Sequence, residues 1–193
     1  MPRIRHFSWE DNEISRTFWG LIPIQRAAAL FRYSRHSPYS RILFELKYHH
    51  QPEIGCVMGR MMAEELLPAG FFDDIDFIVP IPLSRRKERE RGYNQSAWIA
   101  KGIAQITGLP VDTTSVARIL SNPSQTRLSE HQRRSNVRNI FSVRRPEQLE
   151  NRHILLVDDV ITTGATMLSC AETIAGTCRV QISILSLAWA GHS

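Results

Sequence analysis

Short apolar runs alternate with segments of helical periodicity along most of the chain, which predicts an α/β fold. Residues 154–157 form an apolar run without polar alternation, typical of a strand buried on both faces of a parallel sheet. Residues 167–175 repeat apolar side chains every three or four positions and predict a helix. Asp158 and Asp159 follow the strand directly. The local order is therefore strand, acidic pair, small-residue loop and helix.

The same periodicities predict elements on both sides of this stretch. The predicted strands are residues 27–34, 76–79, 116–120, 140–143 and 180–187. Three further helices are predicted. The first begins at Ser37-Pro38 and ends at 47–48, the second covers 52–67, and the third follows residues 92–96 and ends at Gly108. In the first strand, alternation would place residues 27, 29, 31 and 33 on one face. We expect a mainly parallel sheet with helices on both faces.

No linker or repeat divides the chain into separate domains. Residues 1–26 mix Phe18 and two tryptophans with polar residues, and we interpret them as an arm or short helix laid over the core. Residues 27–193 then form one domain. Residues 121–139 are a long polar excursion between two predicted strands. Segments of this kind in compact domains are typical of lids and binding loops.

Composition narrows the function classes. The 193 residues are enough for one well-buried α/β domain. A net charge of +5 and a pI of about 9.5 fit an anionic ligand such as a diphosphate, and also fit nucleic acid. No apolar stretch approaches the ~20 residues of a membrane span, and residues 1–10 lack the apolar segment of a secretory signal. The three cysteines suggest neither disulfides nor a zinc site, so the cytoplasm is the expected compartment.

The chemistry of the loop before the last predicted helix favours a sugar phosphate. A helix start offers unpaired N–H groups and partial positive charge, and Gly164 lets the backbone approach a phosphate closely. The threonine hydroxyls of residues 162–166 add donors. Asp158 and Asp159 would repel phosphate, so ribose hydroxyls or Mg²⁺ are their expected partners. The alternative is an ordinary buried strand before an N-capped helix, which needs only one such polar residue.

Cations follow another predicted strand. Five of the seven residues from Arg85 to Arg91 are Lys or Arg. They lie beyond the carboxyl end of strand 76–79, and that edge is where ligands bind in open α/β sheets. The alternative is a solvated helix face, and the sequence leaves it open.

The stretch Ile154–Thr166 closely resembles the signature of type I phosphoribosyltransferases, which bind 5-phosphoribosyl 1-diphosphate (PRPP). The resemblance implies their α/β fold, with a small hood formed by the chain termini. It implies that Asp158 and Asp159 contact the ribose and stabilise its positive charge during transfer. The implied 5-phosphate loop consists of Val160, Ile161, Thr162, Thr163, Gly164, Ala165 and Thr166. The implied pyrophosphate loop contains Leu83, Ser84, Arg85 and Arg86.

Further motifs resemble the ComF family, phosphoribosyltransferase-like proteins linked to bacterial DNA uptake. They are Leu46-Lys47-Tyr48, Val79-Pro80-Ile81-Pro82-Leu83-Ser84-Arg85-Arg86, Arg89, Arg91-Gly92-Tyr93-Asn94-Gln95, and Gln125-Thr126-Arg127-Leu128 with Arg133, Asn136 and Phe141. Residues 122–138 then correspond to a flexible lid, in which Arg127 and Arg133 are equal candidates to meet pyrophosphate. ComF proteins usually begin with a cysteine-rich zinc-binding segment. This sequence contains no Cys-x-x-Cys, and we expect that segment to be lacking.

The resemblance implies phosphoribosyl transfer from PRPP, with Mg²⁺ held by ligand oxygens and water rather than by a protein cage. A non-catalytic PRPP or nucleotide sensor and a DNA-binding module are the alternatives. The expected partners are PRPP or another ribose 5-phosphate compound, and further candidates are single-stranded DNA, competence proteins and a second copy of the chain. Because neighbouring strand residues point to opposite faces, we expect the strand to end at or just before Asp158, so that both carboxylates reach one ribose.

Overall fold

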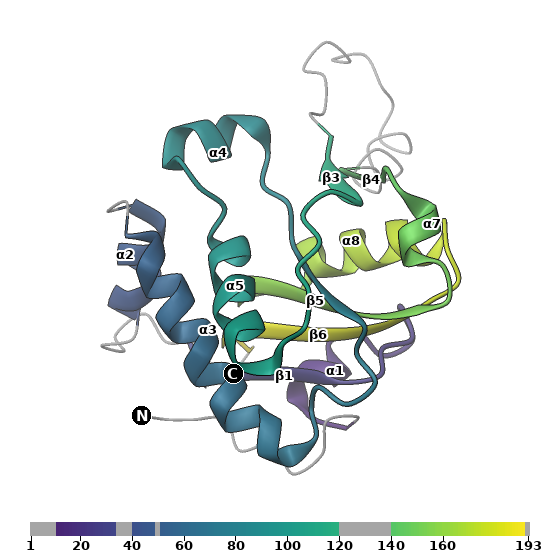
Figure 1. The fold of residues 1–193 in the computed structure, drawn as a ribbon, viewed down its shortest axis with the longest axis horizontal. Helices are drawn as coiled ribbons and strands as arrows, with labels where there is room; N and C mark the ends of the chain where they lie inside the picture. The colour runs from purple at the N-terminus through teal and green to yellow at the C-terminus, as the bar shows by residue number, and fades with distance from the viewer. Residues whose placement is uncertain (1–10, 34–39, 49–50, 120–139, 192–193) are drawn as a thin grey trace.

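The computed structural model describes residues 11–33, 40–48, 51–119 and 140–191. Its centre is a four-stranded parallel sheet in the order β1-β6-β5-β2 (Figure 1). The strands are β1 (Ala27–Arg32), β2 (Phe77–Pro80), β5 (Arg152–Ile161) and β6 (Val180–Trp189). A separate antiparallel pair consists of β3 (Val116–Arg118) and β4 (Phe141–Val143). The prediction of a mainly parallel sheet is confirmed.

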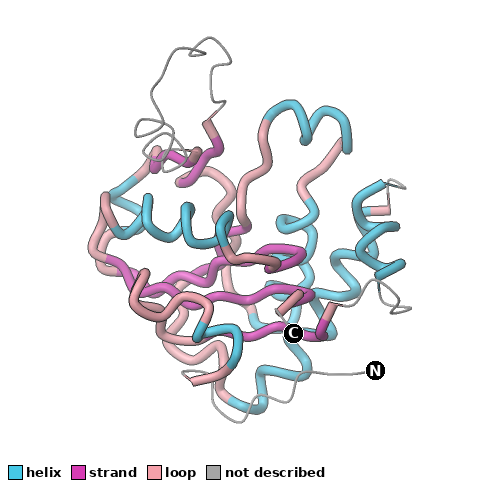
Figure 2. The backbone as a smooth tube through the Cα atoms, turned by 180° about the vertical axis from the view of Figure 1, so that it is seen from behind, coloured by secondary structure: helices cyan, strands magenta, loops and turns pink. Residues whose placement is uncertain are grey.

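Helices cover both faces of this sheet. One face carries α2 (Ser40–Tyr48), α3 (Pro52–Leu66) and α5 (Gln95–Thr107), and the other carries α1 (Glu13–Arg16) and α8 (Ala165–Ala175). Figure 2, seen from behind, brings α8 and α1 to the viewer's side of the sheet. Within β5, Ile154 and Leu156 pack in the core of α8, whereas Leu155 and Val157 pack in the core of α3 and α5. Burial on both faces explains why this strand is an unbroken apolar run.

The contact between α3 and α5 depends on two glycines. A Cβ atom on Gly59 would lie 2.1 Å from the carbonyl oxygen of Ile99, and one on Gly102 would lie 2.1 Å from that of Cys56. The two helix backbones therefore approach more closely than side chains would allow. This close contact holds α5 against the sheet, with its first turn beside the carboxyl end of β5.

Three short helices lie outside these layers. They are α4 (Arg85–Arg91), α7 (Pro146–Leu149) and the 3₁₀ helix η1 (Leu67–Ala69). Helix α4 stands away from the body of the molecule, at the same end as the β3–β4 pair (Figure 1), and none of its residues is buried. The periodicity does not predict α7 or η1, because a single turn is too short to show a repeat.

Residues 11–26 lie over the α8 side of the core. Helix α1 begins at an Asn12 capping box, and Asn12 Nδ2 donates a 2.8 Å hydrogen bond to the carbonyl of Ala27. Ile14 and Phe18 are completely buried. Whether this arm acts as a hood stays a prediction.

Two strand expectations are wrong. In β1, residues 27, 29, 31 and 33 do not share one face: Ala27 and Ala29 lie in the core on the α8 side, whereas Phe31 and Tyr33 pack with the core on the α3 and α5 side. Strand β5 does not end before Asp158 but continues to Ile161. Its ladder with β6 continues through the pairs Val160 with Ala188 and Ile161 with Trp189. The partner strand thus extends β5 beyond the point where its own apolar run stops.

Candidate functional site

The loop between β5 and α8 has a backbone that requires glycine. Gly164 lies in the left-handed region at φ 76°, and its carbonyl accepts a 2.8 Å hydrogen bond from the N–H of Leu168. A Cβ at this position would lie 3.0 Å from Thr17 Cγ2 and 3.2 Å from Phe18 Cε1. Residue 164 is therefore restricted twice, by its backbone angle and by the arm beneath it.

A hollow of about 30 Å³ joins this loop to the acidic pair. It is lined by Asp158 and by residues 160–167. The N-cap residue of α8 is Gly164, which has no side chain that could cap the first turn. The hydroxyl of Thr163 lies nearby, with its Oγ1 3.4 Å from the backbone nitrogen of Ala165. The structure thus brings one carboxylate and a helix N-terminus to one hollow with room for about one water-sized group, and the helix N-terminus offers N–H donors to an anion such as phosphate.

The carboxylate of Asp158 has two donors on one oxygen. Its Oδ1 accepts a 2.8 Å hydrogen bond from the hydroxyl of Ser96, in the first turn of α5, and a 2.9 Å bond from the N–H of Asp159. The pKa of Asp158 is raised to about 7, mainly by burial and secondly by the negative charge of Asp159. Ser96, the Asp159 N–H and Lys47 act in the opposite direction. Near neutral pH this site can therefore hold or release a proton.

The carboxylate of Asp159 has a different partner. Its Oδ2 lies 3.0 Å from Nζ of Lys47, in the last turn of α2, and the two side chains are only 11% and 22% exposed.

The side chains of β5 change faces near the acidic pair. Residues 155 and 157 pack toward the same helix layer as α2. Strict alternation along the strand would place Val160 on the same face of the sheet as Leu156. Val160 instead packs on the opposite face, in the same core as Val157. The alternation of side chains is thus interrupted just after the acidic pair, while the hydrogen-bonded ladder continues.

Sequence reasoning missed Ser96 and Lys47 as contacts of the acidic pair. Lys47 lies in the Leu46-Lys47-Tyr48 motif, and Ser96 directly follows the motif that ends at Asn94-Gln95. A polar residue at a helix start and a cation at a helix end were the available signals.

The expected pyrophosphate residues are only partly brought together. Leu83 and Arg85 line a cavity of about 400 Å³ that Arg118 and Arg144 also line. Ser84 instead caps α4, its Oγ accepting a 3.3 Å hydrogen bond from the N–H of Lys87. Arg85 and Arg86 thus belong to a helix rather than to the expected loop.

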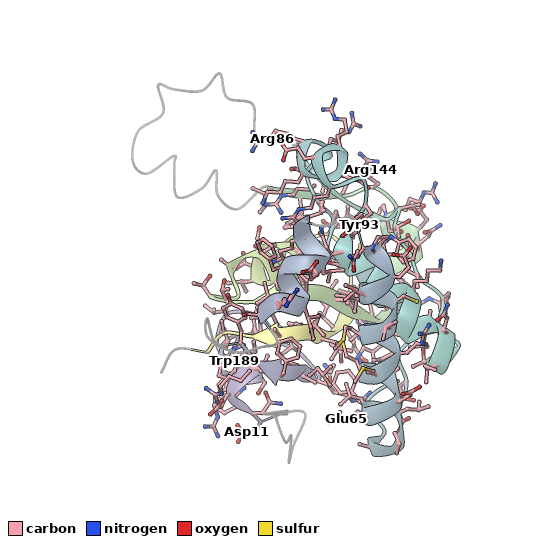
Figure 3. The ribbon with its side chains drawn as sticks, turned by 90° about the vertical axis from the view of Figure 1, so that its left-hand side faces the viewer. Asp11, Glu65, Arg86, Tyr93, Arg144 and Trp189 are labelled. Carbon is pink, nitrogen blue, oxygen red and sulfur yellow. The ribbon has the colours of Figure 1, made fainter. Side chains whose placement is uncertain are left out.

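Arg86 does not line that cavity. It is exposed and lies 3.5 Å from Glu90 on the same helix, which fits the solvated-face alternative. Figure 3 shows Arg86 and Arg144 at one end of the molecule with Tyr93 beneath them. Sequence reasoning missed Arg118 and Arg144, since neither an arginine at the end of the short strand β3 nor one just after β4 belongs to a motif. The lid candidates Arg127 and Arg133 lie outside the described residues.

Within the described ranges, no group of three or more His, Cys, Asp or Glu side chains could hold a metal ion. No helix in the described part of the chain is long and apolar enough to cross a membrane.

Known proteins resemble this chain in sequence. DNA utilization protein YhgH of Salmonella typhi is 31% identical over 165 residues, which span 83% of this chain and 71% of that protein. Competence protein F of Haemophilus influenzae is 29% identical over 134 residues, spanning 67% of this chain and 58% of the relative. The chain belongs to the ComF family. Competence protein ComFC of Bacillus subtilis is 33% identical over 90 residues, spanning 47% of this ComF-family chain and 34% of ComFC. No protein-family model matches the chain.

Solved structures show the fold of this ComF-family protein. Glutamine PRPP amidotransferase from B. subtilis superposes with a TM-score of 0.53 at 19% identity, covering 74% of this chain and 30% of that one. The allosteric regulatory enzyme of purine biosynthesis gives 0.51 at 18% identity, covering 74% and 29%. The type I phosphoribosyltransferase fold predicted from the sequence is therefore confirmed, whereas the roles of individual site residues stay predictions.

Proposed function

We propose that this ComF-family protein binds PRPP at the carboxyl ends of β2 and β5 and transfers its 5-phosphoribosyl group to a nucleophile, releasing pyrophosphate. The observation that carries the proposal is the single hollow lined by Asp158 and by residues 160–167. It combines an acceptor for sugar hydroxyls with a helix N-terminus for the 5-phosphate.

In the proposed reaction the bond between C1 of ribose and the diphosphate oxygen breaks, and diphosphate leaves with the electron pair. The nucleophile donates a lone pair to C1 and afterwards loses a proton. Asp158, when ionised, would stabilise positive charge on the sugar, and Arg85, Arg118 and Arg144 would neutralise the leaving group. Fixed orientation and charge would supply most of the rate enhancement.

Mg²⁺ fits this site as an ion carried by the ligand. Mg²⁺ usually binds one or two carboxylates together with phosphate oxygens and water. Asp159 is already paired with Lys47, so Asp158 is the carboxylate that best suits this role. When bound, the ion would neutralise charge on the diphosphate.

Calorimetry with PRPP and Mg²⁺ tests the proposal. The parent protein should bind, and Gly164→Val should lose binding because a side chain would disturb the loop. Gly108→Val is the matched control, since Gly108 also has a positive φ of 75° but a Cβ added there would have nothing within 4 Å. Release of pyrophosphate in the presence of candidate nucleobases would then test transfer. A parent protein that does not bind PRPP would overturn the proposal.

A DNA-binding role is the second candidate, and one observation favours it. The arginine-lined cavity also contains Tyr93 and Trp98, so aromatic rings lie beside the cations although the sequence does not interleave them. Such a combination suits single-stranded nucleic acid. The names of the relatives, DNA utilization and competence proteins, point the same way. Binding of single-stranded DNA that weakens steeply with salt, and that replacing Arg118 and Arg144 by Ala abolishes, would support it.

A further inference from the structure

We propose that Lys47 is a positioning residue for the sugar part of the candidate site, which fixes the carboxylate of Asp159 for a ribose diol. The inference rests on the proposed function, because it assumes that the ligand carries ribose 5-phosphate. It assigns a role to a residue of α2, far from the phosphate loop in sequence.

The contact is unlike a surface ion pair. Lys47 Nζ lies 3.0 Å from Asp159 Oδ2, and the side chains are 22% and 11% exposed. Exposed pairs are weak because water and salt screen them and two long side chains must be ordered. A shielded pair is held more firmly, since breaking it leaves a charge away from water.

The rest of α2 holds Lys47 in place. Leu43 and Leu46 of the same helix are buried in the core. The carbonyl of Leu46 accepts a 2.5 Å hydrogen bond from the hydroxyl of Tyr93. The ammonium group also lies in the last turn of the helix, where the partial negative charge of the helix end favours a cation. The backbone at Lys47 is thus held in place, and the side chain extends from it to Asp159.

The pairing leaves Asp159 able to accept from a ligand. A carboxylate has two oxygens with two lone pairs each, and Lys47 contacts Oδ2. An ammonium on one oxygen fixes the rotation of the carboxyl group, and so directs Oδ1. A carboxylate held in one orientation accepts from a diol at a lower entropic cost than a rotating one.

The position of Lys47 also links the acidic pair to a second cavity. Lys47, Phe44, Val160 and Thr162 all contribute to a cavity of about 660 Å³ between α2 and the end of β5. The lysine therefore lies beside the place where a sugar bound at Asp158 and Asp159 would contact a group attached to the sugar or a nucleophile approaching the sugar. Loss of Lys47 should accordingly affect recognition of the sugar and not of the phosphate.

Titrations with ribose 5-phosphate and with inorganic phosphate test this inference. The parent protein should bind ribose 5-phosphate more tightly than phosphate. Lys47→Met should lower the affinity for ribose 5-phosphate about tenfold, the size expected for charge-assisted hydrogen bonds, and leave that for phosphate unchanged. Lys47→Arg should recover part of the loss. Lys101→Met is the matched control: it removes a lysine from the exposed side of α5, where its Nζ lies 4.6 Å from the Trp98 ring centroid, and should change neither affinity.

The outcomes separate the inference from the proposed function. If the parent binds ribose 5-phosphate no better than phosphate, the proposed function fails. If the parent discriminates and Lys47→Met does so equally well, Lys47 does not position the site and the inference is overturned. Tighter sugar binding by Lys47→Met would also overturn it, because Lys47 would then be a competitor for the carboxylate. Should Lys47→Met fail to fold, Lys47→Gln, which keeps an amide donor without the charge, is measured in its place with the same expected loss.

Discussion

The hydroxyl of Ser96 donates a 2.8 Å hydrogen bond to Asp158 Oδ1 and so joins the first turn of α5 to the carboxyl end of β5. Ser96 is only 2% exposed, and its contact spans 62 positions of sequence. The serine thereby stabilises the ionised form of a carboxyl group that burial otherwise keeps protonated.

Ser96→Ala should therefore raise the pKa of Asp158 still further and lower the free energy of unfolding by about 1–2 kcal/mol near pH 8, where Asp158 is ionised. Urea unfolding measures the stability, and NMR titration of the carboxyl group measures the pKa. Ser169→Ala is the control, because within the described part of the chain the buried Ser169 hydroxyl has no hydrogen-bond partner. Its removal should cost almost nothing. Equal losses in the two variants would contradict the role given to Ser96.

The raised pKa of Asp158 predicts how stability changes with pH. The pKa is 3.8 for an ordinary Asp and about 7 in the folded protein, so folding favours the protonated form. This group's stabilising contribution is fully present below about pH 4 and is lost as pH rises through about 7. Asp158→Asn, which resembles the protonated acid, should be more stable than the parent at about pH 8 and show a flatter pH dependence. Thermal unfolding across pH checks this, and a parallel pH dependence in both proteins would disprove it.

Asp159→Asn should behave in the opposite way, although it makes the same chemical change one residue later. It leaves the Lys47 ammonium without its carboxylate partner and should cost about 1–3 kcal/mol of stability. Adding Lys47→Met should restore most of that loss, since no isolated charge remains. Urea unfolding of the parent, both single variants and the double variant gives the coupling energy. A coupling near zero would show that the ion pair does not contribute.

Gly164→Ala should destabilise the protein more than Gly108→Ala. Both glycines have φ near 75°, so both substitutions carry a backbone cost of about 1 kcal/mol. At residue 164 the new Cβ would also crowd Thr17 and Phe18, whereas nothing lies within 4 Å at residue 108. The difference in unfolding free energy between the two variants measures how tightly the arm packs against the phosphate loop. Phe18→Leu should reduce that difference by making room.

The elements around the acidic pair were predictable because their patterns are local. The apolar run before Asp158 and the three-to-four spacing after Gly164 each reflect burial of one segment, and both appear in the structure as β5 and α8. The end of β5 was not predictable in this way. Its last residues stay in the sheet through pairing with β6, which a period analysis of β5 alone does not contain.

In the candidate site, too, features local in the sequence were predictable, whereas contacts between distant elements were not. The adjacency of Asp158 to the Gly164 loop is a property of sequence, whereas Lys47 and Ser96 reach the acidic pair only because α2 and α5 pack on the sheet. Arg85 was expected in a loop because the family resemblance assigned it to the pyrophosphate loop. Ser84 and Gly92 supply the cap and the left-handed end that turn residues 85–91 into a helix. Helix caps of this kind can be read from sequence, but a run of charged residues has no apolar periodicity that would indicate the helix between them.

The position of β6 in the sheet sets an order on biosynthesis. β6 is the last strand along the chain, yet it lies between β1 and β5, and it is the sheet neighbour of β1. While the ribosome is still adding residues 180–189, β1 has no strand to pair with and its unpaired backbone edge stays open, even though β2 and β5 can already join. A nascent chain stalled after α8 would carry the phosphate loop on a half-built sheet. Closure of the sheet between β1 and β5 is therefore a late event, because it waits for β6.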